Sequence, residues 1–283
     1  MTSYLIECRW LSDNLNNPDI SVVDASWYLP GMTADGKPRN GRTEYNLRHI
    51  KGAVFFDIDE ISDPESPLPH TVASQEYFAG KVGALGISEK DTIVVYDGMG
   101  LFSAPRVWWN FKTMGAENVF ILNGGLPEWM RLNLPLENKP VSPDPVTFNA
   151  RFNPDAVATL EDVKNTTETG SRQILDARSS GRFTGKAPEP RPGLHSGHMP
   201  GALSLPFDML IENGKLRESD DLEAVFKDVG ADLTMPVITS CGSGITAAIL
   251  TLALDSTGHK AHTLYDGSWT EWGSRDDTTI VSE

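Results

Sequence analysis

Short apolar runs and helical patterns alternate along this chain. The runs at 20–25, 92–96, 173–177 and 236–240 are typical of buried strands. Helical patterns cover 76–85, 104–114, 222–229 and 247–254, and the last of these is apolar on all sides, as in a helix packed on both faces. Strands that alternate with helices predict an α/β fold built on open, mostly parallel sheets flanked by helices.

The pattern occurs twice, with a period of roughly 145 residues. The Asp-Ala pair at 24–25 recurs at 176–177, and the His-x-x-Gly-Ala motif at 49–53 recurs at 198–202. Residues 92–98 match 236–242, which places Asp97 opposite Cys241. We therefore expect two homologous domains, at 1–137 and 155–283, and we expect only the second to carry a nucleophile.

A proline-rich stretch at 138–154 has no periodic apolar pattern and predicts an extended linker between the two domains. Ligands of such sheets bind outside the carboxyl ends of the strands. Cys241 follows the end of a predicted strand. We expect a site there, between the two domains.

The composition is ordinary for a globular protein, but the 283 residues carry a formal net charge of −15. This charge argues against nucleic acid or an anionic membrane as a partner. No apolar run approaches the roughly eighteen residues of a membrane helix, and the start does not read as a signal peptide. The two cysteines form neither a disulfide framework nor a metal motif, so we expect a cytoplasmic protein without metal or cofactor.

Cys241 begins a glycine-rich loop, Cys241-Gly242-Ser243-Gly244-Ile245-Thr246, between a predicted strand and a predicted helix. Such a loop turns backbone N–H groups toward the residue at its start. The helix N-terminus behind it carries about half a positive charge and favours the thiolate over the thiol. The pattern predicts an activated cysteine in an N–H cradle, whereas the other cysteine, Cys8, has no such loop.

Three other interpretations of this loop were considered. A buried structural cysteine is the usual state of an isolated Cys, but it gives no reason for the Gly-Ser-Gly sequence. A cysteine phosphatase needs an arginine six positions after the nucleophile, where this chain has Ala247. The spacing Gly242-x-Gly244-x-x-Ala247 fits a loose dinucleotide fingerprint. However, roughly forty residues follow, too few for a doubly wound nucleotide-binding sheet.

Tandem Asp-Ala and His-x-x-Gly-Ala repeats with a Cys-Gly-Ser-Gly-Ile-Thr loop resemble the two-domain rhodanese superfamily. The resemblance covers 11–275 and includes Phe-Ser-Ala-Pro-Arg-Val-Trp-Trp at 102–109 and Tyr-Asp-Gly-Ser-Trp-Thr-Glu-Trp at 265–272. Within that superfamily the Cys-Gly-Ser-Gly loop is similar to that of 3-mercaptopyruvate sulfurtransferases. Thiosulfate-using members carry basic side chains directly after the cysteine. The resemblance implies tandem rhodanese-like domains.

The resemblance also implies sulfur transfer in two steps. Cys241 attacks the sulfur of 3-mercaptopyruvate, pyruvate leaves, and the resulting persulfide passes its outer sulfur to a thiol such as thioredoxin, or to cyanide. The N–H cradle predicted around Cys241 agrees with this reaction, because a covalent intermediate needs an activated nucleophile. Gly242, Gly244, Ile245 and Thr246 are implied to form the persulfide loop.

The resemblance assigns further residues. Arg182 in Gly-Arg-Phe and Arg191 in Pro-Glu-Pro-Arg are implied to bind the substrate. An α-keto acid requires planar bidentate donors, and the loop itself offers no cation. Ser243, His70 in Ser-Pro-x-x-His and Asp59 in Phe-Phe-Asp-Ile-Asp are implied to form a catalytic relay.

Two alternatives stay open at this stage. A thiosulfate:cyanide sulfurtransferase would prefer thiosulfate as donor. A persulfide carrier would accept sulfur from a partner enzyme, would turn over no small donor, and would not need Arg182 and Arg191 beside the cysteine.

Overall fold

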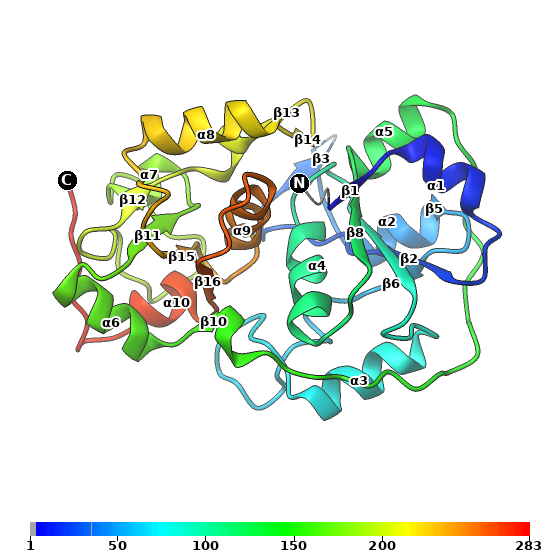
Figure 1. Cartoon of the computed structure of the whole chain (residues 1–283), viewed down its shortest axis with the longest axis horizontal. Helices are drawn as coiled ribbons and strands as arrows, with labels where there is room; N and C mark the ends of the chain where they lie inside the picture. The colour runs from blue at the N-terminus through cyan, green and yellow to red at the C-terminus, as the bar shows by residue number, and fades with distance from the viewer. Residues whose placement is uncertain (1–3, 35) are drawn as a thin grey trace.

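A computed structural model of the chain describes residues 4–34 and 36–283. Figure 1 shows two α/β lobes side by side, with the first half of the chain in one and the second half in the other. Each lobe is built around a five-stranded sheet. The α/β class expected from the sequence is confirmed.

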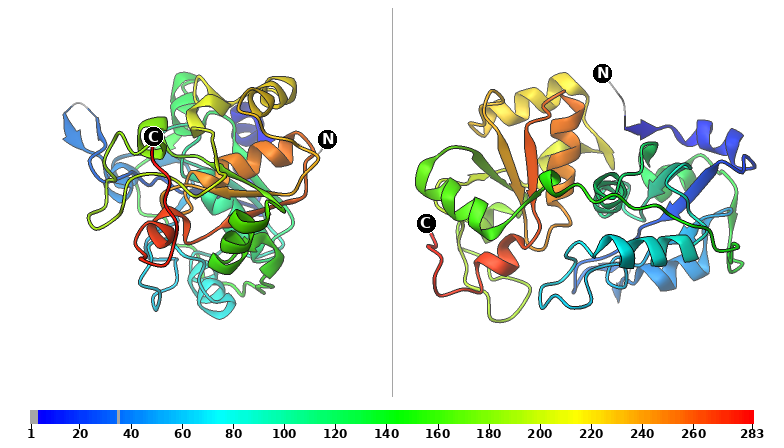
Figure 2. Two further views of the ribbon diagram at one scale, coloured as in Figure 1. Left: turned by 90° about the vertical axis from the view of Figure 1, so that its left-hand side faces the viewer. Right: turned by 60° about the horizontal axis from the view of Figure 1, so that its bottom comes forward.

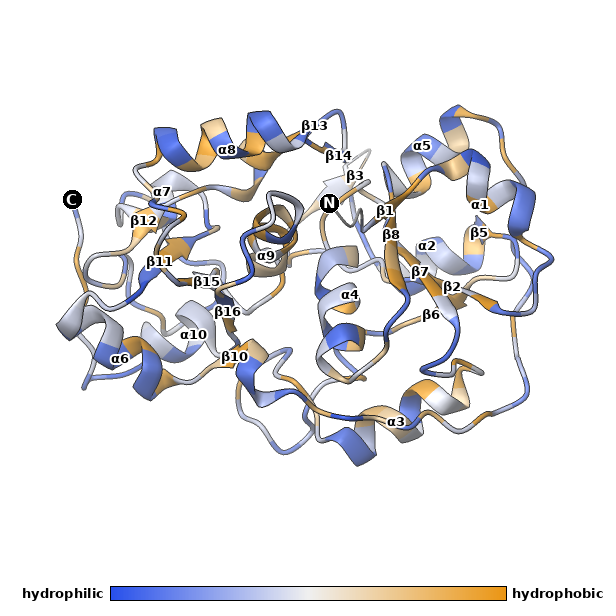
Figure 3. Ribbon diagram, viewed as in Figure 1, coloured by the Kyte–Doolittle hydropathy of each residue, from blue (hydrophilic) through white to orange (hydrophobic). Residues whose placement is uncertain are grey.

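The first sheet has the strand order β1-β8-β7-β2-β6, and all its pairs are parallel. Its central strands are runs of β-branched residues, which favour the extended backbone, and they are coloured as hydrophobic in Figure 3. The strands are β1 (Leu5–Ile6), β2 (Ile20–Asp24), β6 (Val54–Phe55), β7 (Thr92–Tyr96) and β8 (Val119–Leu122).

The second sheet repeats this topology with the order β10-β16-β15-β11-β12, again wholly parallel. Asp24 pairs with Tyr96 in the first sheet, and Asp176 pairs with Ser240 in the second, so the repeat read from the sequence is also the structural repeat. The strands are β10 (Val157–Ala158), β11 (Gln173–Asp176), β12 (Leu203–Ser204), β15 (Val237–Ser240) and β16 (His262–Tyr265).

Helices cover both faces of each sheet (Figures 1 and 2). The first lobe contains α1 (Cys8–Asn14), α2 (Gly41–Leu47), α3 (Gln75–Ala84), α4 (Ala104–Thr113) and α5 (Gly125–Arg131). The second contains α6 (Leu160–Thr169), α7 (Ser180–Phe183), α8 (Ser219–Asp228), α9 (Ala247–Ser256), α10 (Ser268–Trp272) and the 3₁₀ turns η1 (Pro154–Ala156) and η2 (Phe207–Leu210). Three small two-stranded sheets pair β3 (Thr33–Ala34) with β4 (Lys37–Pro38), β5 (His49–Ile50) with β9 (Leu136–Glu137), and β13 (Ile211–Glu212) with β14 (Lys215–Leu216).

The predicted helices are present, with shifts of a few residues at their ends. The largest shift is in α8, which begins at Ser219 rather than at 222. Its first turn holds Asp220 and Asp221, which interact favourably with the positive end of the helix. The apolar pattern did not include this turn because the turn faces solvent.

The two lobes share one hydrophobic core at their boundary. Helix α4 packs against α9 there, and buried side chains of both halves belong to a single cluster. Residues 247–254 of α9 are all buried, as expected from their uniformly apolar character. The domain boundary is therefore a packed interface that can hold side chains from both halves in fixed positions.

The stretch between the lobes runs without helix or sheet pairing from 138 to 153 and crosses the first lobe as an extended chain (Figure 2). Backbone bonds fix it to that lobe, among them Val146 N–H to Gly83 O at 2.9 Å. The Glu89 carboxylate accepts the backbone and side-chain N–H groups of Asn149, and these bonds lower the pKa of Glu89 to about 2. The segment is docked along its length.

Within the described residues, none of the helices has the length and apolar character needed to cross a membrane. The same part of the chain contains no cluster of three or more His, Cys, Asp or Glu side chains that would hold a metal ion.

Candidate active site

Cys241 lies at the carboxyl end of β15, in the loop that leads into α9. Its side chain is 2% exposed, and the loop opens on a cavity of about 210 Å³. Side chains from both lobes line this cavity. Trp27 and Phe102 come from the first lobe, and Phe207 and the Cys241 loop come from the second. The expected location between the two domains is the observed one.

The neighbouring turn into α10 holds the Cys241 loop in shape. Ser268 Oγ accepts the N–H groups of Cys241 and Gly244 at 3.2 and 3.1 Å. Trp269 N–H donates to the Cys241 carbonyl at 2.9 Å, and Thr270 donates to the Gly242 carbonyl from its N–H at 2.9 Å and its Oγ1 at 2.6 Å. The loop carbonyls are thereby directed away from the cavity.

The remaining loop amides are left open. Among the described residues, the N–H groups of Gly242, Ser243, Ile245 and Thr246 donate to no acceptor of the chain. All four residues line the cavity beside Cys241. Unpaired N–H groups at the start of a helix form a site for an anion, so the loop can hold a negatively charged sulfur.

Arg182 lies at the end of α7, on the cavity wall. Its Nε and Nη2 atoms donate to the two oxygens of Glu189, and a Cβ placed on Gly242 would lie 2.9 Å from Arg182 Nη2. A larger residue at 242 would force the Arg182 side chain to shift. Arg182 is therefore held against the Cys241 loop with its Nη1 not used by Glu189.

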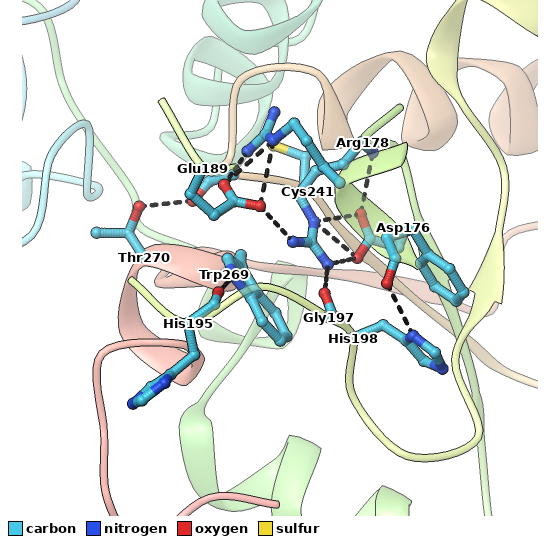
Figure 4. Close-up of polar contacts among 12 residues, drawn as sticks. Asp176, Arg178, Glu189, His195, Gly197, His198, Cys241, Trp269 and Thr270 are labelled. Atoms are coloured by element: carbon cyan, nitrogen blue, oxygen red, sulfur yellow. Dashed lines mark hydrogen bonds and ion pairs between the residues drawn. The ribbon is translucent and has the colours of Figure 1, made fainter. Parts of the chain in front are cut away.

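Glu189 also binds Arg178, whose guanidinium donates to Asp176 and to the carbonyl of Gly197. Figure 4 shows Arg178 between the two carboxylates, next to Cys241. Trp269 lies under Arg178, with its ring centroid 4.1 Å from the guanidinium carbon. Two carboxylates and two guanidinium groups alternate, so this buried cluster is close to neutral as a whole.

Arg191 is different, since its side chain makes no hydrogen bond or ion pair within the described residues. Burial lowers the pKa of its guanidinium, and the positive charge of Arg182 acts in the same direction. The negative charges of Cys241 and Asp59 act in the opposite direction. Arg191 is the cation at the cavity that lacks a partner of its own.

Ser243, His70 and Asp59 are brought together from both lobes. Ser243 Oγ lies 2.9 Å from His70 Nδ1, and His70 Nε2 lies 2.9 Å from Asp59 Oδ1. A carboxylate only accepts, so His70 donates Nε2–H to Asp59, and in the neutral imidazole its Nδ1 then accepts the hydrogen bond from the Ser243 hydroxyl. The hydrogen bond from His70 lowers the pKa of Asp59, and Trp27 Nε1 donates to the same carboxylate at 3.2 Å.

The resemblance gave no role to several residues that shape the site. Glu189 and Ser268 lay inside quoted motifs, but nothing in their spacing showed that one holds Arg182 and the other holds the loop. Trp27, Phe102 and Phe207 carried only the signal of apolar residues. Cys8 is buried, and burial raises the pKa of its thiol to about 12, which makes it an unreactive counterpart of Cys241.

The model of the rhodanese-like domain family matches the chain twice, at residues 7–132 and 159–275. The chain is 43% identical over 279 residues to a 3-mercaptopyruvate sulfurtransferase of Escherichia coli (strain K12), covering 99% of this chain and 98% of the relative. It is 41% identical to thiosulfate/3-mercaptopyruvate sulfurtransferase 1 of Arabidopsis thaliana, a mitochondrial protein, covering 98% of this chain and 78% of the relative.

Among solved structures, the chain resembles SseA of Escherichia coli, described as a 3-mercaptopyruvate sulfotransferase with the rhodanese fold. The TM-score is 0.87 at 42% identity, with 95% of this chain and 99% of that chain covered. The tandem domains, the glycine-rich loop after β15 and the near full-length identity lead to one conclusion. This chain belongs to the rhodanese family and is a two-domain sulfurtransferase of that family.

Proposed function

We propose that this protein transfers the sulfur of 3-mercaptopyruvate, through a persulfide on Cys241, to a thiol or to cyanide. The observation that carries the proposal is the open N–H cradle around Cys241, facing two arginines that come from outside the loop. The loop supplies amides for a sulfur anion, and the arginines supply charge for a carboxylate at a distance from that sulfur.

In the first step, the Cys241 thiolate attacks the sulfur of the donor. The new S–S bond forms as the C–S bond breaks, and the electron pair of that bond passes to the three-carbon fragment as pyruvate enolate. A proton on the enolate carbon completes pyruvate. The persulfide remains on Cys241, where the amides of Gly242, Ser243, Ile245 and Thr246 stabilise its charge.

Arg191 and Arg182 divide the recognition of the α-keto acid. Arg191 has no partner in the protein, so its whole fork is available to the donor carboxylate. Arg182 donates to Glu189 from Nε and Nη2, so its Nη1 is available to donate to the keto oxygen. The apolar wall of Trp27, Phe102 and Phe207 excludes water around these groups, which strengthens both interactions.

The relay of Ser243, His70 and Asp59 moves the proton of this step. Ser243 lies next to the cradle, and His70 is oriented by Asp59, so the proton of the donor thiol can pass through Ser243 to His70 Nδ1 and return by the same route to the enolate carbon. Replacing His70→Ala should lower kcat by about 10²-fold. A kcat within twofold of wild type would remove the relay from the mechanism and leave the rest of it intact.

In the second step an acceptor thiolate attacks the outer sulfur of the persulfide, and Cys241 leaves as thiolate. A thiol of the thioredoxin type becomes a persulfide, and cyanide becomes thiocyanate. Because this chemistry requires free thiols, we propose a reducing compartment, the cytoplasm, as its location. We also propose residues 1–137 and 155–283 as the two domains and 138–154 as their linker.

Steady-state kinetics test the proposal, with 3-mercaptopyruvate and thiosulfate as rival donors and one thiol acceptor. We expect 3-mercaptopyruvate to be better by at least about 10²-fold in kcat/KM, since the loop lacks the cations that suit a sulfate-like donor. Cys241→Ser should be inactive with both. Preference for thiosulfate would contradict the proposal and support the thiosulfate:cyanide alternative, a donor that also appears in the name of the Arabidopsis relative.

The persulfide carrier is tested separately. A carrier does not bind a small α-keto acid, so Arg182→Ala would leave its sulfur loading by a partner enzyme unchanged. We expect this variant to lose turnover of 3-mercaptopyruvate while Cys241 remains alkylatable. Absence of turnover in the wild type, together with normal alkylation, would favour the carrier.

A further inference from the structure

Arg106 is a fully buried cation at the domain boundary that the mechanism above does not use. It lies in the first turn of α4, in the lobe without the nucleophile, and its side chain is 0% exposed. A positive charge at a helix N-terminus opposes the helix dipole, and burial removes its hydration. The fold accepts both costs, so the contacts of this guanidinium are informative.

Arg106 joins three segments that meet at the active site. Its Nη1 donates to the Gly244 carbonyl of the Cys241 loop at 3.3 Å. Its Nη2 donates to the His70 carbonyl at 2.6 Å and pairs with Asp266 Oδ1 at 2.7 Å. Asp266 Oδ2 in turn accepts the N–H of Val72 at 2.7 Å. One ion pair thereby ties the His70 segment of the first lobe to the second lobe.

The contact with Gly244 sets the direction of a cradle amide. In a planar trans peptide the carbonyl and the following N–H point in opposite directions. Arg106 draws the Gly244 carbonyl away from the cavity, so the N–H of Ile245 faces the cavity. Thr270 does the same at the Gly242 carbonyl for the N–H of Ser243. Ser243 is therefore flanked by two fixed peptides, one held from each lobe.

The contact of Arg106 with the His70 carbonyl supports the backbone of the relay histidine. His70 has φ of +65°, an uncommon conformation for a residue with a side chain, so its backbone needs support from its surroundings. Arg106 supplies that support at the His70 carbonyl. The chain also adapts to Arg106, because Gly244 has φ of +79° and a Cβ there would lie 2.6 Å from Arg106 Nη1.

We propose that Arg106, with Asp266, is a positioning residue for sulfur transfer: it aligns the Ile245 amide toward the Cys241 sulfur and holds His70 against Ser243 across the domain boundary. The cradle part of this inference stands on geometry alone, and the His70 part rests on the proposed function. The sulfur chemistry of the catalytic lobe is thus completed by a cation from the other lobe.

Arg106→Lys tests this, because lysine keeps the charge but a single ammonium cannot bond three divergent oxygens as the guanidinium fork does. The readouts are kcat and KM for 3-mercaptopyruvate and the rate of Cys241 alkylation by iodoacetamide at fixed pH. We expect kcat to fall at least tenfold with KM within threefold of wild type, and alkylation to slow at least threefold. A purely structural role would lower the amount of folded protein without these changes per folded molecule.

The matched control is Arg39→Lys. Arg39 also forms a forked ion pair in the first lobe, with Glu44, and it also donates to the carbonyl of a loop glycine, Gly98, but it lies outside the Cys241 cavity. Thermal unfolding of both variants compares their stability. If Arg106→Lys does not fold, Asp266→Asn carries the same test, since an amide oxygen can still accept from Val72 but no longer pairs with Arg106.

A double-mutant cycle with His70→Ala separates positioning from general damage. If Arg106 acts partly through His70, Arg106→Lys costs at least threefold less in kcat when His70 is absent. Additive losses in kcat would overturn the His70 part of the inference. Alkylation and turnover equal to those of Arg39→Lys would overturn the inference as a whole. The alkylation readout needs no donor, so failure of the proposed substrate and failure of this inference give different results.

Discussion

The loop after β7 and the loop after β15 occupy equivalent places in the two sheets. A side chain accepts the backbone N–H groups in the first loop, whereas in the second loop four of these groups are left open. In the first lobe Asp97, 1% exposed, turns its carboxylate back into its own loop. One oxygen accepts the N–H of Met99 at 2.8 Å, and the other accepts those of Phe102, Ser103 and Ala104 at 2.7–2.9 Å. In the second lobe Cys241 stands at this place, and four amides stay open.

The comparison shows how one scaffold gives a closed structural loop in one lobe and an open loop at the candidate site in the other. Both loops are fixed by an equivalent backbone hydrogen bond at their first residue. Leu126 N–H donates to the Asp97 carbonyl at 3.0 Å, and Trp269 N–H donates to the Cys241 carbonyl at 2.9 Å. The difference is the anion. Asp97 supplies a carboxylate of its own loop that accepts the amide N–H groups, whereas Cys241 leaves them open for the sulfur charge that the proposed reaction forms.

A second pair of equivalent positions also differs between the two lobes. Asp24 and Asp176 are equivalent, but Arg178 follows two residues after Asp176, and Ser26 takes that place in the first lobe. Arg178 connects Asp176 to Glu189 and so to Arg182. The described residues of the first lobe contain no such chain of charges, and that lobe instead places His70, Asp59 and Arg106 beside the Cys241 loop.

The largest expected difference between the lobes is catalytic. Cys241→Ser should lower turnover of 3-mercaptopyruvate by about 10⁴-fold or more, because the hydroxyl is not ionised and cannot form the persulfide. Asp97→Asn should leave kcat per folded molecule within about threefold, because Asp97 does not line the cavity and reaches it only through the backbone N–H of Phe102. Steady-state kinetics on folded protein decide this. Comparable losses of kcat in both variants would show that the two loops do not differ in their catalytic role.

For stability we expect the larger effect at Asp97 and the smaller effect at Cys241. Asp97→Ala leaves three buried amide donors and one part-buried donor without an acceptor and should lower the free energy of unfolding by about 3 kcal/mol or more. Cys241→Ser should change it by about 1 kcal/mol or less, because the cradle it faces is already open. Urea unfolding measures both. A change under about 1 kcal/mol for Asp97→Ala would show that the closed loop is not held by its carboxylate.

The two equivalent arginines sharpen the comparison. Arg182→Lys should lower kcat/KM for 3-mercaptopyruvate by about 10²-fold, mostly through KM, since lysine cannot keep Glu189 and contact the donor as a fork. Arg42 follows Gly41 in the first repeat as Arg182 follows Gly181 in the second, and it is half exposed beside Phe55 and Asp57. Arg42→Lys should change kcat/KM by less than about twofold. An equal loss in both variants would place the donor away from the Cys241 cavity.

The last prediction concerns Asp24, which within the described residues has no arginine partner and affects stability over only a narrow pH range. Burial raises its pKa to about 6 from an ordinary value of 3.8. The folded protein therefore binds a proton that the unfolded chain has released, and the resulting stability is lost as pH rises from about 4 to about 6. Over that range Asp24→Asn should gain about 2–3 kcal/mol relative to wild type. Parallel pH–stability curves for the two proteins would contradict the raised pKa.

Much of the fold followed from local pattern. Runs such as Thr92–Tyr96 and Val237–Ser240 are β-branched and apolar, and their strands are where the pattern put them. Matching these runs also placed Asp97 opposite Cys241, which the sheet register confirms. The uniformly apolar α9 was expected to be buried on all sides, and it is. The start of α8 was missed because its first turn is polar and solvated.

The sequence by itself determined the two α/β repeats, the glycine-rich loop after Cys241 and the residue types of the candidate site, because strand patterns, glycine turns and motifs are local properties of the chain. Only the tertiary structure decided which side chains meet. Ser243 and His70 are 173 residues apart, and Arg106 reaches the carbonyl of Gly244 over 138 residues. Such contacts depend on how two folded lobes pack, and no local pattern encodes the angle and depth of that packing.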